Sequence, residues 1–166
     1  MEIEMRLRTL ILDPTTNTPI VILKEVNGEA VLPIWVGSSE AQAIASEIEK
    51  SSSPRPFTHD LFKNLLNQLD AYLTRVVVTE LKDNTFYAIL EIGKDDEKLF
   101  LDARPSDAIA LALRADCPIF VRDEVLRQSR VSEEVESDEF SSFTDDVDDE
   151  EIEWPEELGD LTDYKM

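Results

Sequence analysis

Acidic residues crowd the C-terminal end of this 166-residue chain. Residues 131–166 hold 16 of the 37 acidic residues and one basic residue, Lys165, so their net charge is −15. Long blocks of like charge without helical or strand periodicity bury too little apolar surface to offset the ordering entropy, about 1–2 kcal/mol per residue. We therefore expect one folded domain at residues 1–130 and an acidic, disordered tail at residues 131–166.

The acidic tail allows two interpretations. In the simpler one, which we favour, it keeps the protein in solution. In the other, it binds a protein partner through hydrophobic anchors set among the carboxylates. These anchors would be Phe140, Phe143, Ile152 and Trp154.

Small counts of cysteine, histidine and glycine exclude several kinds of site. One cysteine allows no internal disulfide, and with one histidine it allows no Cys/His zinc cluster. The four glycines are too far apart to form a glycine-rich phosphate loop. No apolar run approaches the roughly 18 residues that cross a bilayer, and the N-terminus lacks the apolar core of a signal peptide. We expect a cytoplasmic protein without a membrane segment.

Short strands alternate with helices along residues 1–130. Apolar residues at every second position from Ile3 to Ile11 predict a strand. The dipeptide Asn27-Gly28 between two apolar runs predicts a two-residue hairpin. Because Pro33 has no N–H, its strand should lie at a sheet edge or a bulge. These hairpins predict an α+β domain with a mixed, largely antiparallel sheet flanked by three helices.

The three helices are expected to begin near Ser38, near Thr58 and around Pro105. Ser39 and Gln42 have the spacing of a capping box. Glu40, in the same turn, is interpreted as a solvated carboxylate that could reach a site. The apolar residues of the second helix that we expect to point inward are Leu61, Phe62, Leu65, Leu66 and Leu69. Residues 123–128 are expected to add a final helical turn.

A first polar cluster runs from Arg55 to Asp60. His59 is the single side chain that titrates naturally near neutrality, so it is a candidate general acid or base. Asp60 could assist it or bind a metal, and Arg55 could hold a phosphate through two N–H groups. The structural alternative is that Thr58 caps the second helix and Asp60 interacts favourably with the helix dipole. Both interpretations stay open.

A second polar cluster contains Lys82, Asp83 and Asn84. Aspartate and asparagine often form turns, because their side chains bond the nearby backbone and tolerate unusual φ angles. The turn is the favoured interpretation of this cluster.

The third polar cluster lies where a strand runs directly into a helix. The exposed N–H groups of a helix N-terminus attract anions, and Arg104 adds a permanent positive charge. Asp102 and Asp107 could instead supply oxygen ligands to Mg²⁺ or Mn²⁺. The structural alternative is equally open: Pro105 suits the first helical position, and Ser106 or Asp107 suits the cap and first turn.

Four sequence strings occur in order along the chain. They are VLPIWVGSSEAQAIA at 31–45, SPRPFTHDLF at 53–62, LKDNTFYAIL at 81–90 and DARPSDAIALALRADCPIFV at 102–121. With these strings the chain resembles the bifunctional nuclease domain family over about residues 1–128. The resemblance implies an α+β fold, a homodimer and, as for some plant relatives, degradation of DNA and RNA. It also favours convergence of the three polar clusters on one site.

Under that resemblance we expect a metal-assisted nuclease that hydrolyses phosphodiester bonds of DNA, RNA or both. The candidate catalytic residues are His59, Asp60, Asp102 and Asp107. The candidate substrate-binding residues are Arg55, Arg104, Ser106, Lys82 and Asn84. The candidate ligands for Mg²⁺ or Mn²⁺ are Asp83, Asp102 and Asp107. The family motifs also include Thr58, Thr85 and Tyr87.

The charge of the domain argues against a nuclease. Residues 1–130 hold 21 acidic and 15 basic residues, a net charge of −6, without a visible basic stripe. Non-specific binding to nucleic acid draws most of its affinity from lysines and arginines that neutralise phosphates. The alternative is a non-enzymatic dimeric module that recruits a protein partner or a small anionic ligand.

Overall fold

The computed structural model describes residues 1–136, which form seven strands and four helices. The strands are β1 (Glu2–Leu12), β2 (Pro19–Glu25), β3 (Val31–Trp35), β4 (Ala71–Lys82), β5 (Thr85–Lys94), β6 (Glu97–Ala103) and β7 (Ile119–Arg122). The helices are α1 (Ser38–Ile48), α2 (Thr58–Gln68), α3 (Pro105–Ala115) and α4 (Asp123–Glu136). In this described part of the chain, no helix has both the length and the apolar character needed to cross a membrane.

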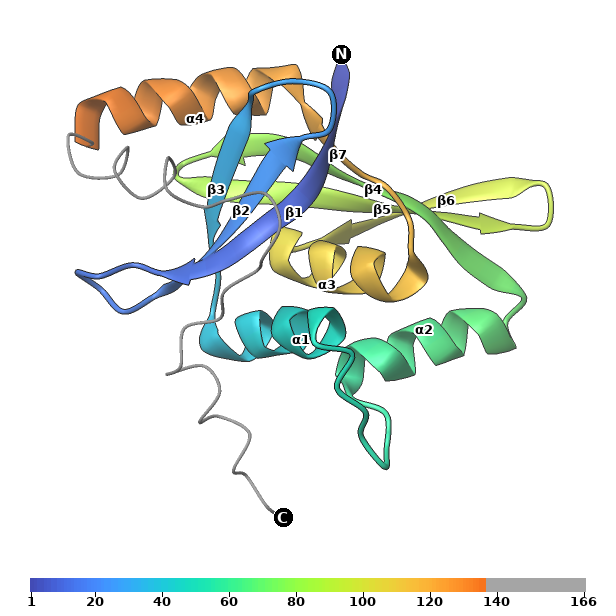
Figure 1. Cartoon of the computed structure of the whole chain (residues 1–166). Coiled ribbons are helices and arrows are strands. Elements are labelled where there is room, and N and C mark those ends of the chain that lie inside the picture. Colours follow the sequence, from blue (N-terminus) through green and yellow to red (C-terminus); the bar gives the residue numbers. More distant parts are fainter. Residues whose placement is uncertain (137–166) are drawn as a thin grey trace.

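The seven strands form one sheet in the order β3-β2-β1-β7-β4-β5-β6. All neighbours pair antiparallel except β4 and β7, which pair in parallel. The short strand β7 lies between β1 and β4 and so joins the two hairpin-linked groups of strands (Figure 1). The expected α+β fold with a mixed, largely antiparallel sheet is confirmed.

Strand β3 lies at one edge of the sheet, and β6 lies at the other. Pro33 is therefore on an edge strand, as predicted, and the β2–β3 register runs through it without a bulge. Because proline lacks an N–H, the edge position removes the need for a hydrogen bond at that point.

The loop between β2 and β3 is longer than predicted. The N–H of Glu25 bonds the carbonyl of Ala30 at 2.8 Å, which leaves four residues between them. None of these four residues has a positive φ, so the two-residue turn at Asn27-Gly28 was wrong. The Glu25 carboxylate folds back over the loop and accepts the Ala30 N–H at 3.2 Å. A Cβ on Gly28 would lie 2.3 Å from that carboxyl group, so the glycine permits the close approach.

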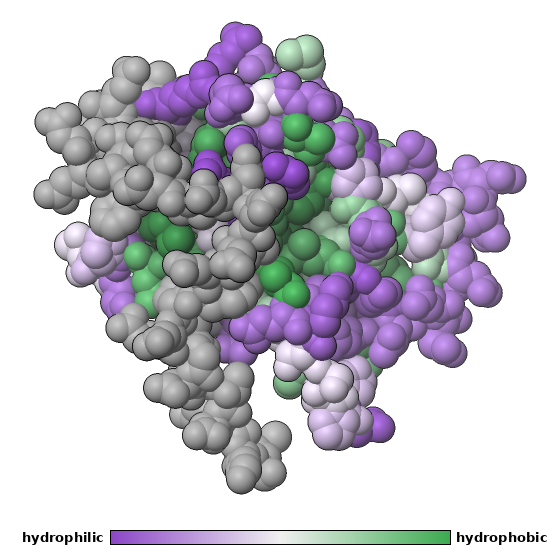
Figure 2. All heavy atoms as spheres, viewed as in Figure 1, coloured by the Kyte–Doolittle hydropathy of each residue, from purple (hydrophilic) through white to green (hydrophobic). Residues whose placement is uncertain are grey.

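Helices α1, α2 and α3 form a layer below the sheet as viewed in Figure 1. Helix α1 buries the side chains of Ala41, Ile44 and Ala45. Helix α3 is the central helix of the layer, because it contacts α1, α2, β4 and β5 and eight of its 11 residues are buried. Figure 2 shows hydrophilic residues around the rim of the same view, with hydrophobic residues between them near the middle. The buried residues of α3 are mostly apolar, so this helix belongs to the core.

Helix α2 is less buried than predicted. Leu61, Leu65 and Leu69 are 59%, 52% and 51% exposed, so the expectation that they point inward was wrong. Of the five residues expected inside, Phe62 and Leu66 pack against the core while remaining partly accessible. The reason is that α2 packs with only one narrow stripe against α3 and β4. An apolar helical pattern states which residues can be buried, but the position of the helix decides which of them are.

The predicted side-chain caps of α1 and α2 do not form. Helix α1 begins after Gly37 without a side-chain cap, so the capping box of Ser39 and Gln42 is absent. Phe57, and not Thr58, occupies the N-cap position of α2. Each proposed cap residue lies inside the first turn, whereas an N-cap residue precedes the first helical residue, so its side chain is not in the capping position.

Helix α3 begins at Pro105, as predicted, with Arg104 at its N-cap position. Ser106 and Asp107 therefore lie in the first turn and are not the cap. Proline suits this first position because its missing N–H would have had no partner inside the helix.

Helix α4 extends further than the single turn expected at residues 123–128. It ends at Glu136 and so crosses the expected domain boundary at residue 130. The described chain thus has four helices where three were expected. Val125 and Leu126 join the hydrophobic core, which explains why this helix belongs to the domain. Residues 137–166, with most of the predicted tail, lie outside the described residues.

Candidate functional site

The histidine of the first polar cluster meets the third cluster. His59 is the second residue of α2, and Asp107 is the third residue of α3. The imidazole Nε2 lies 2.9 Å from Asp107 Oδ1, although 48 positions separate the two residues in the sequence. The His59 side chain is 16% exposed, so a half-buried imidazole is held against a carboxylate at the junction of two helix N-termini.

Arg104 extends this contact into a chain of charged groups. Its Nε donates to Asp107 Oδ2 at 2.7 Å, and one terminal nitrogen lies 2.8 Å from Glu40 Oε1 on α1. Glu40 is therefore paired with Arg104, which corrects the interpretation of it as solvated. The chain Glu40–Arg104–Asp107–His59 links the first turns of α1, α3 and α2.

The electrostatics of this chain favour an ionised Asp107. Burial alone would raise the pKa of the Asp107 carboxyl, but hydrogen bonds from Arg104 and His59 outweigh burial and lower its pKa below the usual value. The pKa of Arg104 is raised, mainly by its hydrogen bond to Asp107 and next by its hydrogen bond to Glu40. Asp107 thus presents a negative charge to the imidazole, and their hydrogen bond fixes the orientation of the ring.

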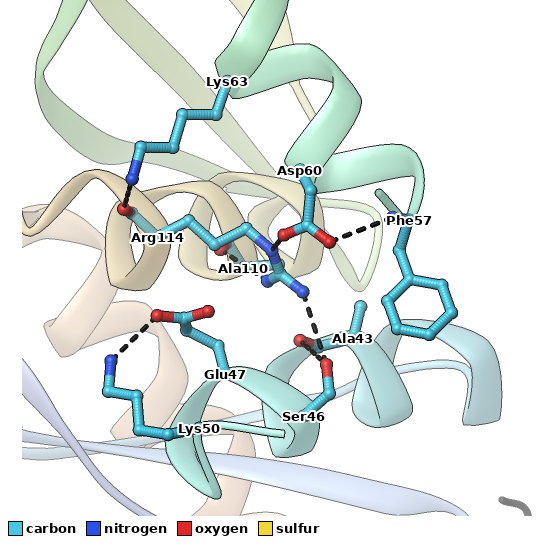
Figure 3. A network of polar contacts seen from close by, with 9 residues as sticks. All are labelled: Ala43, Ser46, Glu47, Lys50, Phe57, Asp60, Lys63, Ala110 and Arg114. Carbon is cyan, nitrogen blue, oxygen red and sulfur yellow. Dashed lines mark hydrogen bonds and ion pairs between the residues drawn. The ribbon is translucent and has the colours of Figure 1, made fainter. Parts of the chain in front are cut away.

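A second pair, Asp60 with Arg114, lies beside this chain. The Arg114 side chain, only 3% exposed, donates from Nε to Asp60 Oδ1 at 2.7 Å. It also donates to the Ala110 carbonyl at 2.9 Å and to Ser46 Oγ at 3.3 Å. Figure 3 shows the guanidinium of Arg114 between Asp60 and Ser46, with the Lys63 ammonium bound to the Arg114 carbonyl. Arg114 therefore ties α3 to both neighbouring helices.

Asp60 has a structural task in this network. Its second oxygen accepts the N–H of Phe57 at 3.0 Å, which satisfies an unpaired group at the start of α2. Burial alone would raise the pKa of Asp60. The hydrogen bonds from Arg114 and Phe57 outweigh burial, so the pKa of this carboxyl group lies below its usual value. Both oxygens of this predicted catalytic residue are engaged in holding α2.

Asp102 points away from the core side of the sheet. Ala103 pairs with Ala88, which is fully buried, whereas Asp102 pairs with Ile89. Because successive side chains of a strand point to opposite faces, Asp102 projects to the face opposite Ala88. Its carboxylate is exposed, and none of its contacts joins it to the His59 chain.

The second polar cluster forms the turn between β4 and β5. Asp83 and Asn84 have φ angles of 49° and 59°, which confirms the predicted turn. Lys82 pairs with Thr85 across it, and all four residues are exposed. Residues 85–87 separate this turn from Ala88, the first residue of β5 that pairs with β6. The structure thus brings the first and third clusters together through hydrogen bonds and gives the second no such bond to them.

Two further candidate residues are close in the sequence to members of the His59 chain. Arg55 is exposed in the segment before α2, and Ser106 is 7% exposed in the first turn of α3.

Sequence reasoning missed Arg114 and its partner Ser46. The available signal was a single arginine in the otherwise apolar run IALALR, since a buried cation requires a partner.

The expected metal ligands do not gather into one group. Within residues 1–136, no three His, Cys, Asp or Glu side chains are grouped so that they could hold a metal ion. Both oxygens of Asp107 already accept hydrogen bonds from His59 and Arg104. The set of Asp83, Asp102 and Asp107 therefore does not fit a metal centre built from protein ligands alone.

The fold and the site together define the class of protein. It is an α+β domain in which an exposed arginine, a carboxylate and an imidazole are linked at the junction of helix N-termini. The chain belongs to the family described by the model "Bifunctional nuclease domain", which matches residues 21–134. An uncharacterized protein of Mycobacterium tuberculosis is 42% identical over 136 residues, covering 82% of this chain and 81% of that protein.

Plant proteins named as nucleases are also similar to the chain. Bifunctional nuclease 1 of Oryza sativa subsp. japonica is 29% identical over 112 residues, 66% of this chain and 34% of the rice protein. Bifunctional nuclease 1 of Arabidopsis thaliana is 28% identical over 107 residues, 62% of this chain and 33% of that protein. The chain thus spans about a third of the length of these plant relatives.

Proposed function

We propose that this protein is a nuclease that hydrolyses phosphodiester bonds of DNA, RNA or both. The contact of His59 with Asp107, in a chain of the bifunctional nuclease domain family, is the observation that carries the proposal. Family membership supports the reaction class, and the contact supports a general base beside a cation.

His59 is the proposed general base. When Nε2 carries the proton that bonds Asp107, Nδ1 is the ring nitrogen with a free lone pair. A water molecule would give a proton to Nδ1 while its oxygen attacks the phosphorus and the P–O bond to the leaving sugar oxygen breaks. That leaving oxygen would take up a proton from the resulting imidazolium or from solvent. Asp107 holds the ring in this tautomer and stabilises the imidazolium that results.

Arg104 is the proposed phosphate-binding group. Its side chain is 64% exposed, and its bonds to Asp107 and Glu40 use two of the five N–H donors of a guanidinium. The other donors can face the charge that develops on the phosphate oxygens during the reaction. Arg55 and Ser106 are proposed to assist in binding, as are Lys82 and Asn84 if substrate extends to the β4–β5 turn.

Mg²⁺ or Mn²⁺ stays a proposed cofactor. Mg²⁺ usually binds one or two protein carboxylates together with waters and substrate phosphates, so a site of three protein ligands is not required. Nuclease assays with added Mg²⁺, added Mn²⁺ or EDTA test this directly. Activity that is equal under all three conditions would contradict a metal requirement.

The experiment that tests the proposed function compares wild type with His59→Ala. We expect the variant to cut labelled single-stranded DNA and RNA at least 100-fold more slowly, the usual contribution of a general base. The matched control is Asn67→Ala, an exposed residue of the same helix, which should keep full activity. Thermal unfolding of both variants separates a catalytic loss from a loss of fold.

Other outcomes of this assay are also informative. Equal cleavage by wild type and His59→Ala would contradict the assignment of His59. No cleavage by pure wild-type protein with either metal would contradict the nuclease and favour the non-enzymatic binding module. A homodimer, a protein partner for the acidic tail and a cytoplasmic location stay predictions.

A further inference from the structure

The two edges of the sheet differ in how they are protected. An edge strand presents unpaired N–H and C=O groups that can pair with another chain, and proteins usually block it with proline, charge or a short strand. Edge strand β3 has five residues and contains Pro33. Edge strand β6 has seven residues, no proline and three consecutive apolar residues, and its charged residues Glu97, Lys98 and Asp102 lie on either side of that apolar centre. The centre of β6 therefore has neither a proline nor a charge to block pairing.

The apolar residues of β6 are exposed on both faces of the sheet. Leu99 and Leu101 are 49% and 44% exposed on the core face, where they pair with Ile92 and Leu90 of β5. Phe100 is 65% exposed on the other face. A free edge with this much apolar surface is unfavourable in water and favours a partner strand.

We infer that β6 pairs antiparallel with β6 of a second copy of this chain, with the two-fold axis at Phe100. In this register Phe100 lies opposite its own copy, and Leu99 lies opposite Leu101. Lys98 then lies opposite Asp102, so each dimer gains two pairs of opposite charge. The sequence Lys-Leu-Phe-Leu-Asp is therefore complementary to itself when it is read in opposite directions.

Neighbouring registers lack this complementarity. Because paired residues must share a face, the axis has to lie at a residue and not between two residues, so the two nearest alternatives are Leu99 and Leu101. An axis at Leu99 would set Lys98 against Phe100. An axis at Leu101 would set Phe100 against Asp102. Each of these shifts places a charge opposite an apolar side chain, which the register at Phe100 avoids.

The pairing also gives Asp102 a role in assembly, whereas Asp102 has no part in the His59 chain. Its exposed carboxylate projects to the face that carries Lys98, whose ammonium already bonds Glu91 at 2.6 Å. In the dimer, the ammonium would lie between Glu91 of its own copy and Asp102 of the other. This role concerns assembly and does not depend on nuclease activity.

Charge variants of the full chain test the register. Asp102→Lys would set lysine against Lys98, and Lys98→Asp would set aspartate against Asp102. We expect each variant alone to weaken the dimer about tenfold or more in sedimentation experiments, because two attractive pairs become repulsive. Mixing the two variants should restore dimers, since both cross-strand pairs then have opposite charges. Thermal unfolding of each variant checks its fold.

Cysteine cross-linking provides a second test that does not depend on charge. In a Cys117→Ala background, F100C should form a disulfide-linked dimer under mild oxidation. Residues directly opposite in antiparallel strands have Cα atoms about 4.5–5.5 Å apart, within the range of a disulfide. The matched control L99C should not cross-link to itself, because in this register it lies opposite Leu101 of the other copy.

Several results would overturn the inference. Wild-type protein that sediments as a monomer at every concentration would remove it. Cross-linking of L99C but not F100C would contradict the register. A dimer that survives Asp102→Lys but is lost on Leu65→Glu would place the contact on α2 and not on β6.

Discussion

Two aspartate–arginine pairs lie side by side in this molecule, and they differ mainly in burial. Asp60 in the first turn of α2 pairs with Arg114, and Asp107 in the first turn of α3 pairs with Arg104, both at 2.7 Å. The Arg114 side chain is 3% exposed, whereas that of Arg104 is 64% exposed. The two aspartates are similarly accessible, at 34% and 28%, so the pairs differ in the burial of the arginine.

This difference separates a structural pair from a candidate functional one. No phosphate in solvent can reach Arg114, and its donors are used by Asp60, Ala110 and Ser46. Arg104 faces solvent while Asp107 holds it beside His59. A surface pair contributes little to stability, whereas a broken buried pair leaves a charge without its partner. Burial thus assigns Arg114 to the fold and Arg104 to the site.

The largest effect is expected from Arg114→Met. Removal of the buried guanidinium leaves the Asp60 carboxylate without its charged partner and removes the hydrogen bonds to Ala110 and Ser46, so the free energy of unfolding should fall by about 3 kcal/mol. Urea unfolding followed by circular dichroism measures this change. The control Arg122→Met, at an exposed position of β7, should change stability by less than about 0.5 kcal/mol. Equal losses in the two variants would end the structural assignment of Arg114.

A smaller effect is expected from the titration of the two aspartates. Each has a pKa below its usual value of 3.8 in the folded protein. A carboxyl group whose folded pKa is lowered stabilises the fold above its unfolded pKa, and this contribution is lost as the pH falls through the folded pKa. Stability should therefore decline from about pH 4 downward.

Asparagine variants sharpen this acid dependence. Asp60→Asn and Asp107→Asn each remove one titrating group, so each should reduce stability at pH 7 and flatten its decline below pH 4. Melting temperatures measured between pH 2.5 and pH 7 check both points. An acid decline unchanged in both variants would show that other carboxyl groups cause it.

The smallest effect on stability is expected from Arg104→Met. Because the side chain is largely exposed, its ion pairs with Asp107 and Glu40 should contribute less than about 1 kcal/mol. Nuclease activity should fall much more than stability, because the phosphate would lose its cation. Urea unfolding and cleavage assays on the same preparation separate the two. A loss of stability as large as that of Arg114→Met would remove the contrast between the two pairs.

Local sequence patterns correctly predicted the elements that depend only on residues close together in the sequence. Alternation predicted β1, Pro105 marked the start of α3, and the pair Asp83-Asn84 marked the β4–β5 turn. Pro33 even indicated an edge strand, because a missing N–H is a property of the residue and not of its surroundings. These features depend on neighbours within a few positions.

Predictions failed where a distant partner decided the outcome. Leu65 has the spacing of a buried helical residue, but α2 lies where that face meets solvent. Thr58 is a good cap residue, yet Asp60 satisfies the backbone N–H at Phe57 instead. Residues 123–128 resemble a short turn, although the core contacts of Val125 and Leu126 sustain a helix of 14 residues.

The sequence by itself determined the α+β class, the order of most elements and the candidacy of His59, because each depends on residue chemistry and short-range spacing. The tertiary structure decided that Asp107 is the partner of His59 and that Arg114 is buried while Arg104 is exposed. Hydrogen bonds between residues some 50 positions apart form only after the helices pack on the sheet, and no local pattern encodes that packing.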